Sequence, residues 1–251
     1  MSSEDSGPAI ELVGLSKSYG VHRAIDGVTL SIERGEIFGY LGRNGAGKTT
    51  TLLILAGLIR PSGGDARVLG RSVLRDPVEV KRRIGYVPES GAVFEKLTPR
   101  ESLSTMGGLH GLSGRALAEK VDELVDAFGL GEVADHRLDT FSKGMKQKVC
   151  IASAIVHDPE VLLLDEPLNG LDIESVVAVK ELLRRHSSRG RTVLYTSHLV
   201  DVVEKICTRI AVLAVGRLMT LGTAEELRVA TGAGTLEEAL VRTWNVPRPA
   251  V

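Results

Sequence analysis

The segment GRNGAGKT at residues 42–49 constrains this 251-residue chain more than any other feature. It follows the apolar run IFGYL and precedes a helix-forming stretch, so we predict a strand, a tight loop and a helix in that order. Glycine at Gly42, Gly45 and Gly47 lets the backbone adopt conformations closed to other residues and turn several N–H groups towards one anion. The helix that begins near Lys48 adds the positive end of its dipole. The segment is therefore predicted to bind the phosphates of a nucleotide.

The side chains of this loop have distinct predicted roles. The Lys48 ammonium would reach the β- and γ-phosphates, and the Thr49 hydroxyl would hold Mg²⁺. A pattern of this length can arise by chance in a chain with 28 glycines, and the flanking strand and helix favour the functional interpretation. The remaining residues expected to contact nucleotide are Arg43, Asn44, Ala46 and Thr50.

The bulk properties allow one substantial core, or one core with an inserted lobe. The formal net charge is -1, so no global field attracts nucleic acid or an anionic membrane, and we expect no nucleic-acid partner. Cys150 and Cys207 lie in apolar patterns without metal-ligand spacing, which favours buried free thiols in a reducing compartment. No apolar stretch reaches the length of a spanning helix, and the polar start MSSEDSGPAI is not typical of a signal peptide. A cytosolic chain that can dock on a membrane partner is expected.

The order of patterns predicts an α/β fold. Short apolar runs from Ile10 to about Ile37 indicate an antiparallel β layer, and buried strands alternating with helices after residue 160 indicate a parallel sheet. Between them lies a helical pattern. We predict a P-loop NTPase core with an antiparallel β layer and an inserted α-helical lobe. The expected divisions are a disordered leader at 1–8, the ATP-binding domain at 9–230 with its lobe at about 93–156, and an extension at 231–251 that ends in a loose tail, WNVPRPAV.

The apolar strand VLLL at 161–164 ends in two acids. Ligands sit at the carboxyl ends of strands in open parallel sheets, so Asp165 would hold Mg²⁺ and Glu166 would orient or deprotonate the attacking water. The alternative is a pair of solvated acids before a turn at Pro167. A phosphate loop upstream favours the functional interpretation.

The segment FSKGMKQ at 141–147, called the signature segment below, predicts the start of a helix capped by Ser142. Taken alone, it is an ordinary helix start. Its position at the end of the helical lobe, 23 residues before Asp165, favours a further role for Ser142 and Gly144.

These motifs together resemble the ATP-binding subunits of ABC transporters over nearly all of residues 10–225. GRNGAGKTT is similar to the Walker A motif, VLLLDEP to Walker B, and FSKGMKQ stands where the family has LSGGQ. The resemblance implies the following roles for single residues: Asp172 in the D-loop, His198 as the switch histidine, Tyr19 as the aromatic stacked on adenine, and Glu89 at the Q-loop position near Mg²⁺.

Several positions depart from the family pattern. Glu89 replaces glutamine, Lys143 and Met145 replace the first glycine and the final glutamine of the signature, and Leu168 replaces threonine or serine. These departures, together with the segment GYVPESGAVFEKLT, make the sequence similar to the branch of the family that serves ABC-2 type exporters of drugs, antibiotics and polysaccharides.

Three of these residues have simpler alternatives. Tyr19 could be a core aromatic at a strand end, although stacking on a base is favourable by roughly 1–3 kcal/mol. His198 could cap the next helix rather than sense the γ-phosphate. Asp172 could cap the helix that follows it and still face a dimer partner.

The resemblance implies a mechanism with two subunits packed head to tail, as a homodimer or with a paired ABC ATPase. Each ATP, with Mg²⁺, would lie between the Walker A loop of one chain and the signature of the other. A separate multi-span permease would bind them at the cytoplasmic face of the membrane. The alternatives are a soluble non-transport ABC ATPase of the translation or DNA-repair type and a nucleotide-binding regulator without turnover, against which Glu166 argues.

Overall fold

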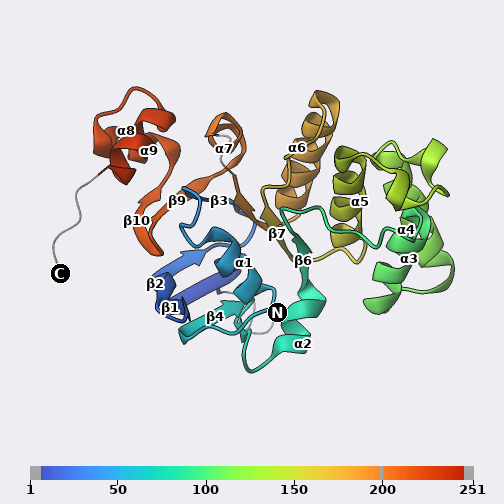
Figure 1. Ribbon diagram of the computed structural model, residues 1–251, viewed down its shortest axis with the longest axis horizontal. Helices are drawn as coiled ribbons and strands as arrows, with labels where there is room; N and C mark the ends of the chain where they lie inside the picture. The colour runs from blue at the N-terminus through green and yellow to red at the C-terminus, as the bar shows by residue number, and fades with distance from the viewer. Residues whose placement is uncertain (1–6, 198–199, 246–251) are drawn as a thin grey trace.

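The computed structural model describes residues 7–197 and 200–245, and two β-sheets lie at its centre (Figure 1). One sheet is antiparallel and has the strand order β2-β1-β4-β5. Its strands are β1 (Ile10–Tyr19), β2 (His22–Ile32), β4 (Gly63–Val68) and β5 (Arg71–Ser72).

The second sheet has the order β10-β9-β3-β8-β7-β6. Its strands are β3 (Ile37–Gly42), β6 (Ile84–Val87), β7 (Val161–Asp165), β8 (Thr192–Thr196), β9 (Arg209–Ala214) and β10 (Arg217–Gly222). All its neighbouring strands pair in parallel except β10, which runs antiparallel to β9. The carboxyl ends of β3, β7 and β8 therefore meet at one edge of the sheet, where ligands bind in this class of fold.

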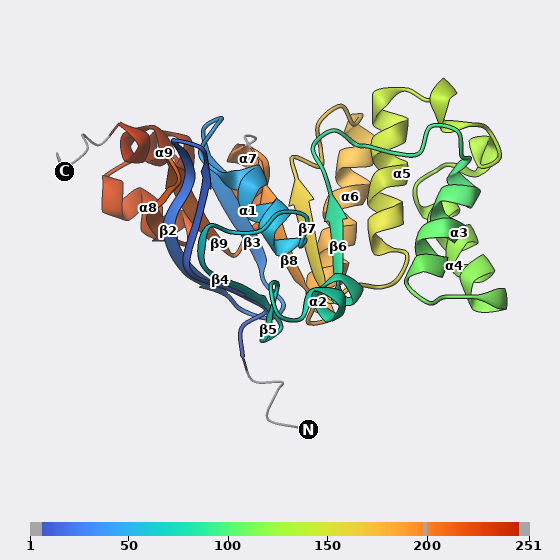
Figure 2. The ribbon, with the colours of Figure 1, turned by 60° about the horizontal axis from the view of Figure 1, so that its bottom comes forward.

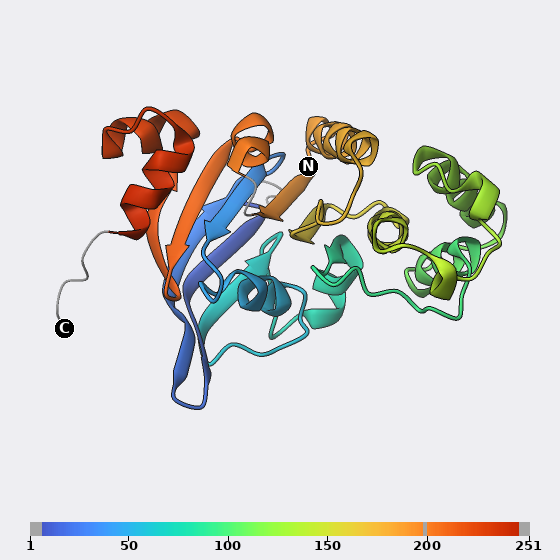
Figure 3. The same cartoon turned by 45° about the horizontal axis from the view of Figure 1, so that its top comes forward.

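Helices cover the sheets and extend the molecule at both ends. They are α1 (Lys48–Leu55), α2 (Pro77–Arg83), α3 (Pro99–Leu109), α4 (Gly114–Ala127), α5 (Lys143–Ile155), α6 (Ile173–Ser188), α7 (Val200–Ile206), α8 (Ala224–Thr231) and α9 (Leu236–Trp244), with 3₁₀ turns at Gly131–Val133 and Leu138–Thr140. Figure 2 shows α3, α4 and α5 grouped at one end and α8 with α9 at the other. Figure 3 shows the same separation between the green-to-yellow helices and the red C-terminal helices.

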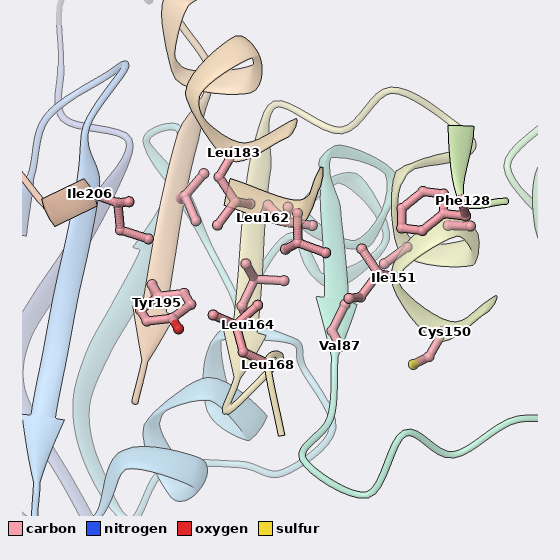
Figure 4. Packing of buried hydrophobic residues seen from close by; sticks show 14 of the residues in the cluster. Val87, Phe128, Cys150, Ile151, Leu162, Leu164, Leu168, Leu183, Tyr195 and Ile206 are labelled. Atoms are coloured by element: carbon pink, nitrogen blue, oxygen red, sulfur yellow. The ribbon is translucent and has the colours of Figure 1, made fainter. Parts of the chain in front are cut away.

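The central strands β3, β7 and β8 are buried on both faces, which explains why they read as continuous apolar runs. Along β7, Val161 and Leu163 face a core shared with α1 and the antiparallel sheet, whereas Leu162 and Leu164 face a core shared with α5 and α6. Figure 4 shows part of this second core. Burial raises the pKa of the Cys150 thiol to about 12, as expected for a packed free thiol rather than a reactive one.

The predicted fold class is confirmed, with the antiparallel layer, the parallel sheet and helices α3–α5 inserted in the chain between β6 and β7. The sequence patterns did not reveal β4, β5, β6, β9 or β10. The expectation of a loose tail is wrong for Trp244, which ends α9 and packs against the core. Within the described ranges, no helix is both long enough and apolar enough to cross a membrane.

Candidate nucleotide-binding site

The loop after β3 has the geometry of a phosphate cradle. Gly45 and Gly47 have φ values of 78° and 100°, in the left-handed region that favours glycine. A Cβ at Gly47 would also lie 2.5 Å from the Ala24 carbonyl oxygen. Gly42 is different from what we expected, because it is absent from the residues with positive φ. It is required by packing instead, since its Cβ would lie 2.7 Å from the Ala46 Cβ.

Lys48 is the first residue of α1 and is buried at 8% exposure. Its Nζ donates to the Gly42 carbonyl oxygen at 2.8 Å, across the mouth of the loop. An ammonium has three N–H donors, so this contact orients the side chain and leaves donors for phosphate oxygens. Thr51 also stabilises the loop, because its hydroxyl donates to the Gly47 carbonyl oxygen at 3.0 Å.

The two acids after β7 are both buried, and they differ in environment. Asp165 Oδ1 accepts from the Thr196 hydroxyl at 2.7 Å, while Oδ2 has no hydrogen-bond partner among the described residues. Glu166 has φ 49°, a left-handed conformation that is uncommon for glutamate. Its N–H donates to the Thr196 hydroxyl at 3.0 Å. Strain of this kind persists only where surrounding contacts hold it.

Most of the predicted nucleotide residues line one cavity of about 680 Å³. They are Tyr19, Asn44, Gly45, Ala46, Gly47, Lys48, Thr49, Thr50, Glu89, Asp165 and Glu166. Tyr19 is half exposed, and the Lys17 ammonium lies 5.1 Å from its ring centroid. It is therefore not a core aromatic, which was the alternative interpretation.

Two residues of this cavity were missed by sequence reasoning, His22 and Ala24. His22 pairs with Tyr19 across the tight turn between β1 and β2. The signal was the short YGVH turn between two apolar runs, which brings its flanking residues side by side. Thr196 was also missed, because a buried strand residue carries no motif of its own.

Five of the described residues predicted to bind nucleotide do not line the cavity: Gly42, Arg43, Ser142, Gly144 and Asp172. Ser142 is exposed and caps α5, accepting from the Met145 N–H at 3.3 Å, so the predicted cap is confirmed. Gly144 packs inside its own chain, where a Cβ would lie 2.6 Å from the Gly170 carbonyl oxygen.

Asp172 also lies outside the cavity and caps α6, as predicted. Its carboxylate accepts from the Ser175 N–H at 2.8 Å, and this bond, together with the Ser175 hydroxyl and Lys148, lowers the pKa of Asp172 to about 2. His198, the predicted switch residue, lies outside the described residues.

A P-loop between a parallel strand and a helix, with two acids at the end of another strand of the same sheet, defines a nucleoside-triphosphate-binding protein. A protein-family model described as "ABC transporter" matches residues 25–169. The chain is 43% identical over 228 residues to the daunorubicin/doxorubicin resistance ATP-binding protein DrrA of Streptomyces peucetius, covering 91% of this chain and 69% of that protein.

Solved structures agree. An ATP-binding subunit of an ABC transporter superposes with a TM-score of 0.88 at 31% identity, covering 94% of this chain and 99% of the other. A dimeric ATP-binding cassette in a post-hydrolysis state, bound to ADP and Pi, gives 0.79 at 25% identity, covering 85% and 98%. The chain belongs to the ABC transporter family, as an ABC ATPase. The resemblance inferred from the motifs is confirmed.

Proposed function

We propose that this chain is the ATP-hydrolysing subunit of an ABC-2 type exporter of drugs or antibiotics, and that two such subunits pack head to tail around shared ATP. One observation supports the proposed dimer. The phosphate loop and both acids line one cavity, whereas Ser142 and Gly144 lie outside it. One chain thus holds two half-sites. A second chain in head-to-tail orientation would complete both, and the dimeric neighbour bound to ADP and Pi supports this pairing.

The cavity residues have separate roles in this proposal. The loop N–H groups and the Lys48 ammonium bind the β- and γ-phosphates. Tyr19 presents its half-exposed ring to adenine. Ser142 and the backbone around Gly144 bind the γ-phosphate held by the other chain, at the N-terminus of α5, where the helix dipole favours an anion.

Glu166 is the general base. Its carboxylate takes a proton from water as the water oxygen bonds to the γ-phosphorus, and the bond between this phosphorus and the bridging oxygen breaks to leave ADP and phosphate. Lys48 stabilises the negative charge that develops on the phosphates. His198 is proposed to contact the γ-phosphate.

The residues present fit a magnesium ion. The Asp165 Oδ2 atom is buried without a partner among the described residues and comes from the same cavity as Thr49. Oxygen atoms of this kind are the ligands that Mg²⁺ prefers, so Thr49 and Asp165 would hold it, together with Glu89, which lines the same cavity. The ion would offset negative charge on the phosphates.

The export role rests on the similarity to DrrA, whose name describes it as a drug-resistance ATP-binding protein. We infer a separate multi-span permease as partner, and therefore a location at the cytoplasmic face of the membrane. The second ATPase of the complex would be another copy of this chain or a paired ABC ATPase.

The catalytic part of the proposal is tested with Glu166→Gln. The variant keeps the shape of the side chain but cannot take a proton, so turnover should fall by about 10² to 10⁴ while ATP still binds. Light scattering with ATP and Mg²⁺ should then detect a stable dimer. Glu160→Gln is the matched control, because Glu160 lies just before the opposite end of β7 and pairs with Arg34 and Arg83 at the surface. Parent-like ATPase activity of Glu166→Gln would refute the assignment.

The transport part is tested by affinity isolation of the tagged Glu166→Gln chain from detergent-solubilised membranes. Mass spectrometry should find a multi-span membrane protein in stoichiometric amount. A chain that hydrolyses ATP and dimerises, but is recovered entirely away from membranes, would instead support the soluble non-transport ABC ATPase.

A further inference from the structure

Gln147 is a buried polar residue at the start of α5, exposed at only 1%. Its Nε2 donates to the Pro167 carbonyl oxygen at 2.9 Å, and Pro167 directly follows Glu166. Its Oε1 is buried and has no hydrogen-bond partner among the described residues. Burying an amide in this way is unfavourable unless its hydrogen bonds are made, so a half-satisfied amide at this site calls for an explanation.

A third segment of the site also meets Gln147. Gly91 follows Glu89 in the turn after β6, where its N–H donates to the Pro88 carbonyl oxygen at 3.1 Å. Gly91 has φ 58°, which favours glycine, and a Cβ there would lie 2.4 Å from Gln147 Oε1, so the two residues are in close contact. The Gln147 amide therefore lies where the Glu89 turn, the loop that begins at Glu166 and the signature segment converge.

The start of α5 contacts that loop at two further places. Gly144 lies directly against the Gly170 carbonyl oxygen, with room for no side chain. Lys148 Nζ lies 3.6 Å from Asp172 Oδ2. These contacts lie at the surface, and the Gln147 bond is the buried one next to the catalytic carboxylate.

Glu166 needs such support because of its backbone. Its left-handed conformation is unfavourable for glutamate and must be held by its neighbours. The Thr196 hydroxyl holds its N–H on one side. On the other side the next carbonyl group, that of Pro167, is held by Gln147.

We propose that Gln147 is a positioning residue that fixes the catalytic Glu166 loop to the signature segment of the same chain. Because this inference rests on the proposed head-to-tail dimer, the two segments that Gln147 joins act on two different ATP molecules. A shift of the signature segment on the partner's ATP is then transmitted to Glu166 beside the chain's own ATP. Gln147 touches neither nucleotide, and its effect is on the rate and cooperativity of hydrolysis.

Two substitutions separate the hydrogen bond from the packing. Gln147→Leu retains most of the volume and removes the N–H donor, and Gln147→Glu retains the shape but replaces the donor with a carboxylate. Ser153→Ala is the control, because Ser153 is a buried polar residue of the same helix that faces Ser102 on α3. For both Gln147 variants at pH 8 we expect kcat to fall about tenfold, as for the loss of one buried hydrogen bond, with KM for ATP within about twofold of the parent. The Hill coefficient should fall towards that of independent sites.

The pH dependence of Gln147→Glu supplies a signature that a purely structural role would not give. The introduced carboxyl would be buried beside Pro167, which follows Asp165 and Glu166, and beside the turn that contains Glu89, with Lys143, Lys146 and Lys148 on its own helix. Once protonated, it can donate an O–H to the Pro167 carbonyl oxygen. The ratio of its kcat to the parent's should therefore rise as pH falls from about 8 to 6, whereas the ratio for Gln147→Leu should stay constant.

The outcomes separate this inference from the proposed function. If the Glu166→Gln chain fails to dimerise with ATP and Mg²⁺, the proposed function fails first. If that chain dimerises and both Gln147 variants keep the parent's kcat and Hill coefficient, the inference is wrong. Should Gln147→Leu lose its fold by circular dichroism, the Gln147→Glu series decides, and a kcat ratio that does not change with pH overturns the proposal.

Discussion

The hydroxyl of Thr196 donates to Asp165 Oδ1 at 2.7 Å, linking the last residues of two neighbouring parallel strands. The hydroxyl oxygen of Thr196 also accepts a hydrogen bond from the Glu166 N–H at 3.0 Å. One hydroxyl thus orients the acid proposed to hold magnesium and the backbone of the proposed base. Because Oδ1 is engaged and Oδ2 of Asp165 has no partner among the residues that the structure describes, Oδ2 is the atom available to a ligand.

Thr196→Val should therefore impair catalysis more than folding. The variant keeps the β-branched shape but leaves the Asp165 carboxylate free to rotate, so we expect kcat to fall about tenfold, the equivalent of roughly 1.4 kcal/mol. Steady-state ATPase assays test this. Thr192→Val is the matched control at the other end of β8, where the hydroxyl accepts from the Gly35 N–H at 3.1 Å. Equal losses of activity in both variants would contradict the role of Thr196.

Lys48→Ala should weaken nucleotide binding and hydrolysis together. It removes a charge-assisted donor that the contact with Gly42 already orients, and such bonds contribute about 1.5–3 kcal/mol. Calorimetry with ATP should show at least about a tenfold loss of affinity, and Lys120→Ala, which disrupts only a surface pair with Glu123 on α4, should show none. Unchanged binding and turnover would mean that this loop is not the phosphate site.

The proposal that two chains share each ATP site can be tested by a substitution in the signature segment, and the structure shows which residue is suitable. Gly144→Asp, the obvious choice, would force its side chain against the Gly170 carbonyl oxygen and disturb the chain's own D-loop. Ser142 is exposed and its role in the cap can be kept by Asp or Asn, since both are good caps. These two substitutions differ only in charge.

Ser142→Asp should fold, bind ATP at its own loop and remain monomeric with ATP and Mg²⁺, because its carboxylate repels the γ-phosphate of the partner's ATP. Ser142→Asn should dimerise like the parent. Light scattering, with Glu166→Gln as the background that slows hydrolysis, measures the difference. Equal dimerisation of the two variants would restore the simpler interpretation, in which the segment is only a helix start.

Stability should fall in mild acid because of His157. Its Nε2 lies 2.9 Å from the Ile84 carbonyl oxygen, and its ring stacks on His110 with centroids 3.5 Å apart. Burial, followed by the charge of His110, lowers the pKa of His157 to about 4. Since the ordinary value is 6.5, the unfolded chain binds this proton more tightly than the folded chain. The contribution is complete above pH 6.5 and is lost as pH falls towards 4.

Urea titrations at several pH values test this. The free energy of unfolding should decrease from pH 7 to pH 5, and His157→Gln should reduce that dependence. Part of it should persist, because burial also lowers the pKa of His186 to about 4. His136→Gln, at an exposed position, should leave the dependence unchanged. An unaltered slope in His157→Gln would show that His157 is not responsible.

The sequence by itself determined the local chemistry of this protein. A glycine-rich loop needs particular backbone conformations at Gly45 and Gly47, and an apolar strand ending in Asp165 and Glu166 needs a buried sheet. Such requirements are local, so they can be read from consecutive residues. The same holds for the caps at Ser142 and Asp172, where a side chain bonds to a backbone three residues away.

Only the tertiary structure decided which distant segments support one another. Thr196 reaches Asp165 because β7 and β8 pair in parallel, and Gln147 reaches Pro167 because α5 packs at the end of β7. Gly42 is another residue whose requirement only the tertiary structure explains. Glycine is needed at this position because Ala46 approaches it closely, and not because of its φ angle. Long-range packing sets these contacts, and no local pattern of residues encodes them.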